Sequence, residues 1–368
     1  MYSQQEIDDA VTAGVISAKA ADSLRSHISS QRSIAIPDEE QFRLLTGFND
    51  IFVSVAAAIL LFAVAWIGQT IGKGMGLTVD AQGPSFLAPL AVAATAWGLA
   101  MFFTAKRRMA LPSILLLLAF VLAAFCTAAF GAVQMIGAEN MDNNNVAGAM
   151  IAALAGGIAA VAAWAHWRTF RVPITIAAGA ASVAAIVVAL IVAVVGPNAG
   201  GLKDIILGST LVLGIGVFLF AMWWDGSDRE RLTRRSDVAF WLHLLAAPMI
   251  VHPIFTLLGL NDGSASVGEG LVVILLYVIL GLTAVAIDRR ALLVSALAYV
   301  LYALNQLFEQ FGAVELNVAL TALVIGSALL MLSAFWHQAR ALVVRPLPPG
   351  LKDRLPLIDR AAIPQPAA

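Results

Sequence analysis

Long apolar stretches separated by short polar connections dominate the chain from residue 51 to residue 336. A helix needs about 20 mostly apolar residues to cross the roughly 30 Å hydrocarbon core of a bilayer. Ten stretches meet this requirement, so we predict an all-α fold, a polytopic membrane helix bundle of about ten transmembrane helices. The ten are Ile51–Ile71, Phe86–Thr104, Ala110–Val133, Val146–Ala165, Val172–Gly196, Asp204–Trp224, Val238–Leu260, Leu271–Ile287, Ala291–Phe311 and Leu316–Trp336.

The composition agrees with a membrane protein and excludes several other classes. Of the 368 residues, 60% are apolar and 12% charged, whereas a soluble globular chain is about half apolar and a quarter charged. The net charge of -1 gives no electrostatic footprint for nucleic acid. The single cysteine, Cys126, cannot form a disulfide or a cysteine-based metal cluster within one chain.

The positions of lysine and arginine predict the orientation, because these residues accumulate in cytoplasmic loops. With ten crossings and a cytoplasmic N-terminus, 20 of the 22 basic residues fall inside, and only Lys73 and Lys203 fall outside. We therefore predict that both termini are cytoplasmic. Six tryptophans near the inferred cytoplasmic ends are typical of an aromatic belt at the headgroup level: Trp164, Trp167, Trp223, Trp224, Trp241 and Trp336.

Polar segments flank the predicted membrane domain, which spans residues 51–336. Residues 1–50 form a cytoplasmic helical segment in which Gly14 is placed to end a first helix and Ser17 to begin a second. Helices this short bury too little surface to fold alone, so we expect residues 1–45 to dock on the bundle, to pair in a homo-oligomer or to bind a cytoplasmic partner. Residues 337–368 form a proline-rich basic tail that favours extended or disordered backbone.

One face of the ninth apolar stretch carries polar side chains at helical spacing. Lipid cannot satisfy such groups, so the face should point into the bundle or into a wet cavity. The alternative is that Glu309 reaches the outer interface and that the tyrosines hold neighbouring helices by hydrogen bonds. The stripe consists of Ser295, Tyr299, Tyr302, Gln306 and Glu309, with Asn305 beside it.

His252 in the seventh stretch is predicted to lie near the depth of Glu309. Pro248 and Pro253 would bend that helix and free backbone carbonyls. A pair of His252 and Glu309 could pass a proton or bind a cation, although a kinked packing helix would show the same residues. The candidate polar pocket therefore consists of Tyr302, Asn305, Gln306, Glu309 and His252.

Sequence motifs give no indication of catalysis, and we expect no catalytic residues, cofactor or metal site. The charged stretch from Asp225 to Asp237 is interpreted as a solvated cytoplasmic loop. Acidic side chains elsewhere in the membrane domain fall at helix ends, where water or headgroups can reach them: Asp50, Asp204, Asp288 and Glu315. Small residues predict close helix contacts in two stretches: Gly148, Ala152, Gly156 and Ala160 in the fourth, and Gly208, Gly214 and Gly216 in the sixth.

Residues 7–24, IDDAVTAGVISAKAADSL, combine an aliphatic helix, a Gly-Val-Ile-Ser turn and a second helix ahead of a many-helix block. This layout resembles bacterial inner-membrane proteins grouped under a domain of unknown function with a short cytoplasmic N-terminal helix pair. The resemblance implies the bacterial inner, or cytoplasmic, membrane as the location. It implies no activity and no functional residue.

Two functions fit these predictions. Ten helices with both ends inside is also the layout of carriers built from two inverted five-helix halves, which suggests a carrier of a small solute. Against this analogy, the two halves show no sequence echo, and their corresponding third-to-fourth connections differ in length. The alternative is a non-catalytic membrane scaffold or sensor that acts through its N-terminal helices.

Overall fold

The computed structural model describes most of the chain, and gaps fall mainly in its N-terminal segment, several loops, the region 291–315 and the C-terminus. The described residues are 11–24, 48–80, 82–137, 145–196, 199–229, 231, 233–259, 267–290, 292–294, 297, 300–301, 304, 308, 316–353 and 355–356. The chain forms two compact units, one of residues 1–42 with 359–368 and one of residues 43–358.

The described part of the first unit, residues 11–24, confirms the predicted turn at Gly14 and a second helix that follows Ser17. Gly14 adopts a φ of 71°, and its N–H donates to the carbonyl of Val11 at 3.0 Å. A left-handed residue at this point ends the helix at little steric cost, because glycine has no Cβ. The Ser17 hydroxyl accepts from the N–H of Ala20 at 3.2 Å and so caps the second helix.

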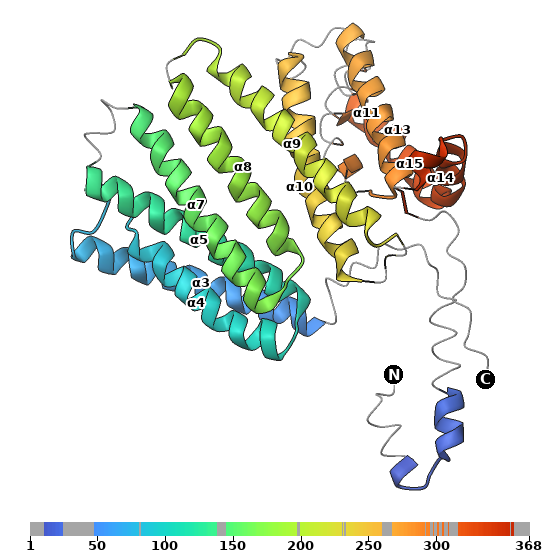
Figure 1. Ribbon diagram of the computed structural model, residues 1–368, viewed down its shortest axis with the longest axis horizontal. Coiled ribbons are helices and arrows are strands. Elements are labelled where there is room, and N and C mark those ends of the chain that lie inside the picture. The colour runs from blue at the N-terminus through green and yellow to red at the C-terminus, as the bar shows by residue number, and fades with distance from the viewer. Residues whose placement is uncertain are drawn as a thin grey trace. The chain divides into compact units, whose positions relative to one another are not determined.

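The second unit is a bundle of helices, and its described residues contain no strand, only one isolated bridge between Thr78 and Ser85. Helices that follow one another along the chain pack side by side as hairpins (Figure 1). The helices are α3 (Phe48–Gly74), α4 (Leu87–Ala100) with its π-helical extension η1 (Met101–Lys106), α5 (Ala110–Ile136), α7 (Asn145–Phe170), α8 (Ile174–Val195), α9 (Leu202–Gly226), α10 (Arg234–Leu257), α11 (Val267–Ile287), α13 (Asn317–Ala334), α14 (Trp336–Val344) and α15 (Pro349–Lys352).

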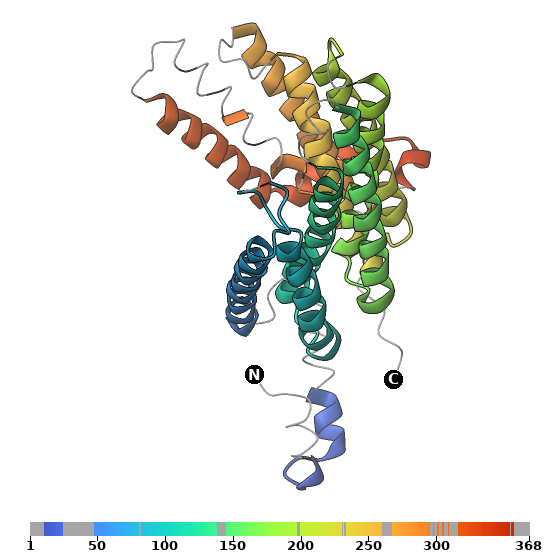
Figure 2. The same ribbon diagram turned by 90° about the vertical axis from the view of Figure 1, so that its left-hand side faces the viewer.

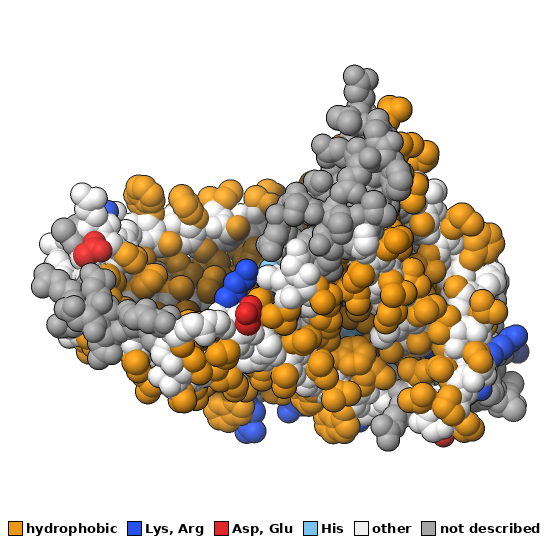
Figure 3. All heavy atoms as spheres, turned by 90° about the horizontal axis from the view of Figure 1, so that it is seen from above, with side chains coloured by type: hydrophobic (Ala, Val, Ile, Leu, Met, Phe, Trp, Pro, Cys, Tyr) orange, Lys and Arg blue, Asp and Glu red, His pale blue; other side chains and the backbone are white. Residues whose placement is uncertain are grey.

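Seven of these helices are long and apolar enough to cross a membrane: α3, α4 with η1, α5, α7, α8, α9 and α10. Much of their surface is apolar and exposed, as expected for side chains that face lipid (Figure 3). Figure 2 shows α3 (blue) beside α4 and α5. The chain is therefore a helical, multi-pass membrane protein, as predicted.

The predicted count of ten crossings is not confirmed. The eighth stretch is the shorter apolar segment Leu271–Ile287 of α11, and most of the ninth, Ala291–Phe311, lies outside the described residues. The tenth stretch, Leu316–Trp336, corresponds to α13, which ends at Ala334 and is followed by α14 at an angle of 76°. The described helices give seven crossings, or eight if α13 and α14 together make one.

Glycine contacts confirm the predicted close approach in two hairpins. A Cβ on Gly156 would lie 2.8 Å from the Ile186 side chain, so α7 and α8 meet there. A Cβ on Gly214 would lie 2.9 Å from the backbone of Met249, so α9 and α10 meet at that level. A Cβ on Gly208 or Gly216 would meet no atom within 4 Å. Of the three glycines predicted to allow close contact on α9, only Gly214 does so.

The predicted extended tail is partly folded. Residues 336–344 form α14 and residues 349–352 form α15, and Val344 and Leu355 are buried in the hydrophobic core. The Arg340 guanidinium, 4% exposed, donates to the carbonyl of Pro356 at 2.6 Å. The basic residues of this segment thus serve packing as well as charge, which composition alone does not reveal. Residues 357–368 lie outside the described part of the chain.

Candidate functional site

A buried cluster of charged and polar side chains lies where α9 ends, α10 begins and α11 ends. Asp225, His243 and Arg289 are 1%, 0% and 2% exposed. The Arg289 guanidinium donates to both carboxylate oxygens of Asp225, with its Nε 3.2 Å from Oδ2 and an Nη2 contact to Oδ1. His243 Nε2 lies 3.0 Å from Asp225 Oδ2. The three side chains form one ion-paired triad inside the protein.

The placement of Asp225 is electrostatically costly without these partners. It occupies the last turn of α9, where the helix dipole presents its negative end. A buried carboxylate also loses its hydration, so it requires a close counter-charge and hydrogen bonds. Arg289 and His243 supply both.

The end of α11 delivers Arg289 to this position. Asp288 takes a left-handed conformation with φ 57°, and its N–H donates to Val285 while the N–H of Arg289 donates to Ala284. These two bonds form the Schellman ending of a helix, with an aspartate where glycine or asparagine is usual. The reversal of direction directs Asp288 and Arg289 into two separate networks.

Asp288 anchors the second network. Its Oδ2 accepts from Arg231 at 2.9 Å and lies 3.9 Å from Arg340, and its Oδ1 accepts from the indole N–H of Trp336 at 2.7 Å. Burial on its own raises the pKa of Asp288, but the charges of Arg231 and Arg340 and the Trp336 hydrogen bond outweigh it and hold the pKa below 3.8. The carboxylate is therefore ionised at neutral pH.

The α9–α10 connection is fixed by its own side chains. Asp228 Oδ2 accepts from the Thr233 N–H at 2.9 Å and from its hydroxyl at 2.7 Å, and Thr233 in turn caps α10 by accepting from the Arg235 N–H. Arg229 donates to the carbonyls of Leu355 and Lys352, each at 3.0 Å. The connection is thus tied to the folded tail.

His243 has one ring nitrogen in use and one available. Because a carboxylate can only accept, Nε2 carries the proton that it donates to Asp225. Nδ1 then has a lone pair and is buried without a hydrogen-bond donor among the described residues. The ring packs edge-on against Phe218, with 5.3 Å between ring centroids. This nitrogen can accept a proton.

Of the predicted pocket residues, the structure describes only His252. It is exposed on α10, between the buried Val251 and Pro253. Tyr302, Asn305, Gln306 and Glu309 lie outside the described residues, so the pocket and the pairing of His252 with Glu309 stay predictions. Val300 and Leu304, from the same stretch, are buried in a core with α10, α11 and α13.

Two interpretations of charged residues were wrong, and one tryptophan has surroundings that the sequence did not indicate. The stretch from Asp225 to Asp237, expected to be a solvated loop, begins with a buried carboxylate. Asp50, expected at an accessible helix end, is 2% exposed, whereas Asp204 is exposed as predicted. Trp336, assigned to the aromatic belt, is 3% exposed and bonded to Asp288.

Among the described residues, no group of three or more His, Cys, Asp or Glu side chains has the arrangement of a metal site. Comparison of the chain with family models, with curated proteins and with solved structures found no match. The resemblance of residues 7–24 to bacterial inner-membrane proteins stays a hypothesis.

Proposed function

We propose that this multi-pass membrane protein carries a small solute across the bacterial inner membrane in exchange or symport with protons. Both termini would lie in the cytoplasm if the chain crosses ten times, because that count places 20 of the 22 basic residues inside. The single observation that carries the proposal is the buried ion-paired triad of Asp225, His243 and Arg289, which lies at the ends of the apolar helices α9 and α11 and against α10. Ionisable groups held inside a membrane bundle are costly and typically serve ion or proton pathways.

The triad can take up one further proton. As arranged, Asp225 is negative, Arg289 positive and His243 neutral, so the group carries no net charge. A proton on Nδ1 of His243 would place two cations against one carboxylate at low dielectric, where charge interactions are strong. One of the two cations must then move or find an anion.

Arg289 is the cation placed to move. It follows the end of α11 rather than lying within a helix, whereas His243 is held in α10. Pro248 and Pro253 remove backbone hydrogen bonds from α10 beyond His243, which lowers the cost of bending that helix. Protonation of the triad could therefore be coupled to a rearrangement of α10 against α11.

Transport into proteoliposomes tests the proposal. The full-length chain would be reconstituted with an entrapped pH-sensitive dye and exposed to a panel of amino acids, sugars, nucleosides and organic anions. We expect at least one solute to drive proton movement at several times the rate of empty liposomes. Asp225→Asn and His243→Gln should abolish that movement, while Arg345→Gln, an exposed arginine away from the triad, should retain it.

Failure of every solute in the panel to move protons would contradict the carrier. Equal rates for the wild type and Asp225→Asn would contradict the assignment of the triad as the proton site.

A second candidate function, a scaffold or sensor, is favoured by the first unit. Two large apolar side chains there are exposed, Val15 by 75% and Leu24 by 42%. Such side chains beside a short helix pair suit docking of a partner or of a second copy. Deletion of residues 1–45 should then remove partner capture and self-association while leaving solute-driven proton movement intact; identical capture by both forms would contradict the scaffold.

A further inference from the structure

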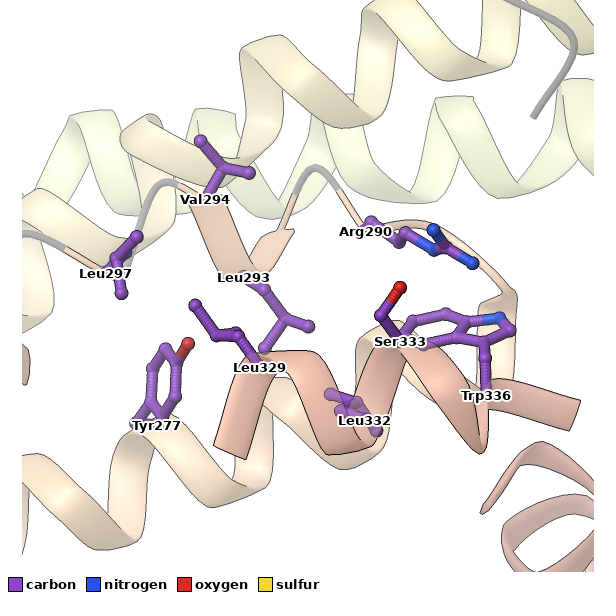
Figure 4. A pocket seen from close by; sticks show the side chains of 9 residues that line it. All are labelled: Tyr277, Arg290, Leu293, Val294, Leu297, Leu329, Leu332, Ser333 and Trp336. Carbon is purple, nitrogen blue, oxygen red and sulfur yellow. The ribbon is translucent and has the colours of Figure 1, made fainter. Parts of the chain in front are cut away.

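A small cavity lies between α11, the segment that carries Arg290, Leu293, Val294 and Leu297, and α13 (Figure 4). Its volume is about 120 Å³. Leu293, Leu329 and Leu332 line its middle, and Arg290, Ser333 and Trp336 form one end. The cavity thus has an apolar body and a polar, cationic end, which is the polarity of a lipid molecule.

Among the described residues, the cationic end has no counter-ion. The Arg290 guanidinium carbon lies 4.8 Å above the Trp336 ring, a cation–π contact. No hydrogen bond or ion pair joins its guanidinium to another described residue. Two described acids of the neighbouring networks are committed elsewhere, because Asp288 pairs with Arg231 and Asp225 with Arg289. An anion is therefore the missing partner of Arg290.

The bend after α13 indicates the depth of this end in the membrane. If α13 crosses the bilayer, α14 at 76° to it runs close to the membrane plane. The sides of α14 fit this position, since Trp336, Arg340 and Val344 are buried against the protein and Leu342 is 78% exposed. Arg290 and Trp336 would then lie at headgroup level, where tryptophan and arginine are favoured.

From this level the apolar part of the cavity runs along α13, whose outer face is apolar and exposed. Leu330 and Met331 on α13 are 73% and 63% exposed. A chain entering the cavity from the bilayer would replace lipid contacts with contacts to Leu329 and Leu332. Such insertion adds van der Waals contacts and exposes no apolar group to water.

We propose that this cavity binds an anionic phospholipid of the surrounding bilayer, with the phosphate on Arg290 and a stretch of one acyl chain among the leucines. Basic pockets between transmembrane helices on the cytoplasmic side are typical sites for such headgroups. The site does not depend on the carrier function, because it uses neither Asp225 nor His243.

Native mass spectrometry of the full-length chain tests the site, with dioleoyl phosphatidylglycerol competing against dioleoyl phosphatidylcholine in nanodiscs. We expect the wild type to retain phosphatidylglycerol preferentially after release. Arg290→Gln should lower that preference about five-fold, as expected for the loss of one basic residue near the surface. Arg345→Gln removes the same charge from an exposed position outside the cavity and should leave the preference unchanged.

Two further measurements separate a bound lipid from general attraction to a basic surface. Leu329→Trp fills the cavity and should reduce retention of phosphatidylglycerol while Arg290 is present. Phosphatidylglycerol with a photoreactive acyl chain, used on the wild type, should label residues 290–297 and 329–336. Equal losses in Arg290→Gln and Arg345→Gln, full retention in Leu329→Trp, or labelling confined to other segments would each overturn the proposal.

Discussion

Two helix hairpins of this bundle each bury a histidine completely, and their surroundings differ. His166 near the end of α7 lies among the rings of Trp97, Phe120 and Phe170, at 6.2, 6.1 and 4.6 Å between centroids. Its one polar contact is a 3.4 Å approach to Thr175. His243 in the α9–α10 hairpin instead contacts the ion pair of Asp225 and Arg289.

The comparison teaches that burial of an ionisable side chain does not identify a functional site. His166 has neighbours that favour a neutral, aromatic packing residue. Each histidine keeps one buried ring nitrogen without a hydrogen-bond partner among the described residues, but His243 also has an acidic partner and a nearby cation, so a proton there changes the charge balance of three side chains. The predictions below test whether the two hairpins differ as this account requires.

The largest effect should follow removal of Arg289. Arg289→Met leaves the carboxylate of Asp225 buried without its counter-charge, which typically costs about 3 to 5 kcal/mol. Thermal unfolding in detergent measures the loss, with Arg345→Met as a control that should change little. The double variant Arg289→Met with Asp225→Leu should recover most of the stability; a double variant as unstable as the single one would contradict the ion-pair interpretation.

The histidines themselves should respond unequally to replacement by phenylalanine. His243→Phe removes a donor from a buried carboxylate and should cost about 1 to 3 kcal/mol. His166→Phe places a ring among rings and should leave stability nearly unchanged. Unfolding midpoints of the two variants measure the difference, and equal losses would show that the hairpins are not distinct in this respect.

Glycines at the two hairpin contacts offer a packing test. Gly214→Ala brings a Cβ against the backbone of Met249, which cannot yield easily, and should cost about 1 to 2 kcal/mol. Gly156→Ala meets the Ile186 side chain at 2.8 Å and backbone atoms only at ordinary contact distances of 3.5 and 3.6 Å, so it should cost less. Gly216→Ala, which meets nothing, should be neutral or slightly stabilising. The reverse order of unfolding midpoints would contradict the contacts described for α9 and α10.

The smallest effect concerns acid stability at Asp288. Its pKa is below the ordinary 3.8, so its ionised form stabilises the fold fully above that value, and the contribution is lost as pH falls through the folded-state pKa. Unfolding midpoints of the wild type should therefore decrease below about pH 4 more steeply than those of Asp288→Asn. Parallel curves would show that the Arg231 and Trp336 contacts do not depend on the charge.

The apolar pattern was sufficient to predict the seven long helices α3, α4 with η1, α5, α7, α8, α9 and α10, because hydrocarbon thickness imposes a length that any span must meet. The turn at Gly14 and Ser17 could be predicted as well, because these two residue types favour the end of one helix and the start of the next. The bend between Ala334 and Trp336 coincides with the predicted end of the tenth stretch, but α14 beyond it was not predicted, because its sequence WHQARALVV leads into a proline-rich tail that favours extended backbone. Only contacts with Asp288 and Arg290 distinguish Trp336 from a belt tryptophan.

The triad could not be predicted from the sequence for a related reason. Arg289 lies 64 residues after Asp225, and His243 lies 18 residues after it. No rule of sequence spacing links an acid at the end of one helix to an arginine that follows the end of another helix. Asp225 in the last turn of an apolar helix, where the dipole disfavours it, is the local signal that could have identified the site.

The most direct test of the central claim is ¹⁵N NMR spectroscopy of the full-length protein in nanodiscs, with ¹⁵N-labelled histidine and arginine. The His243→Gln variant assigns the His243 signals. We predict that His243 is neutral and protonated on Nε2 at high pH. On acidification it should gain a proton on Nδ1 while the Arg289 guanidinium signal shifts over the same pH range. A His243 that stays neutral until the protein unfolds, with an unchanged Arg289 signal, would show that the triad is a static structural link and would contradict its role in proton coupling.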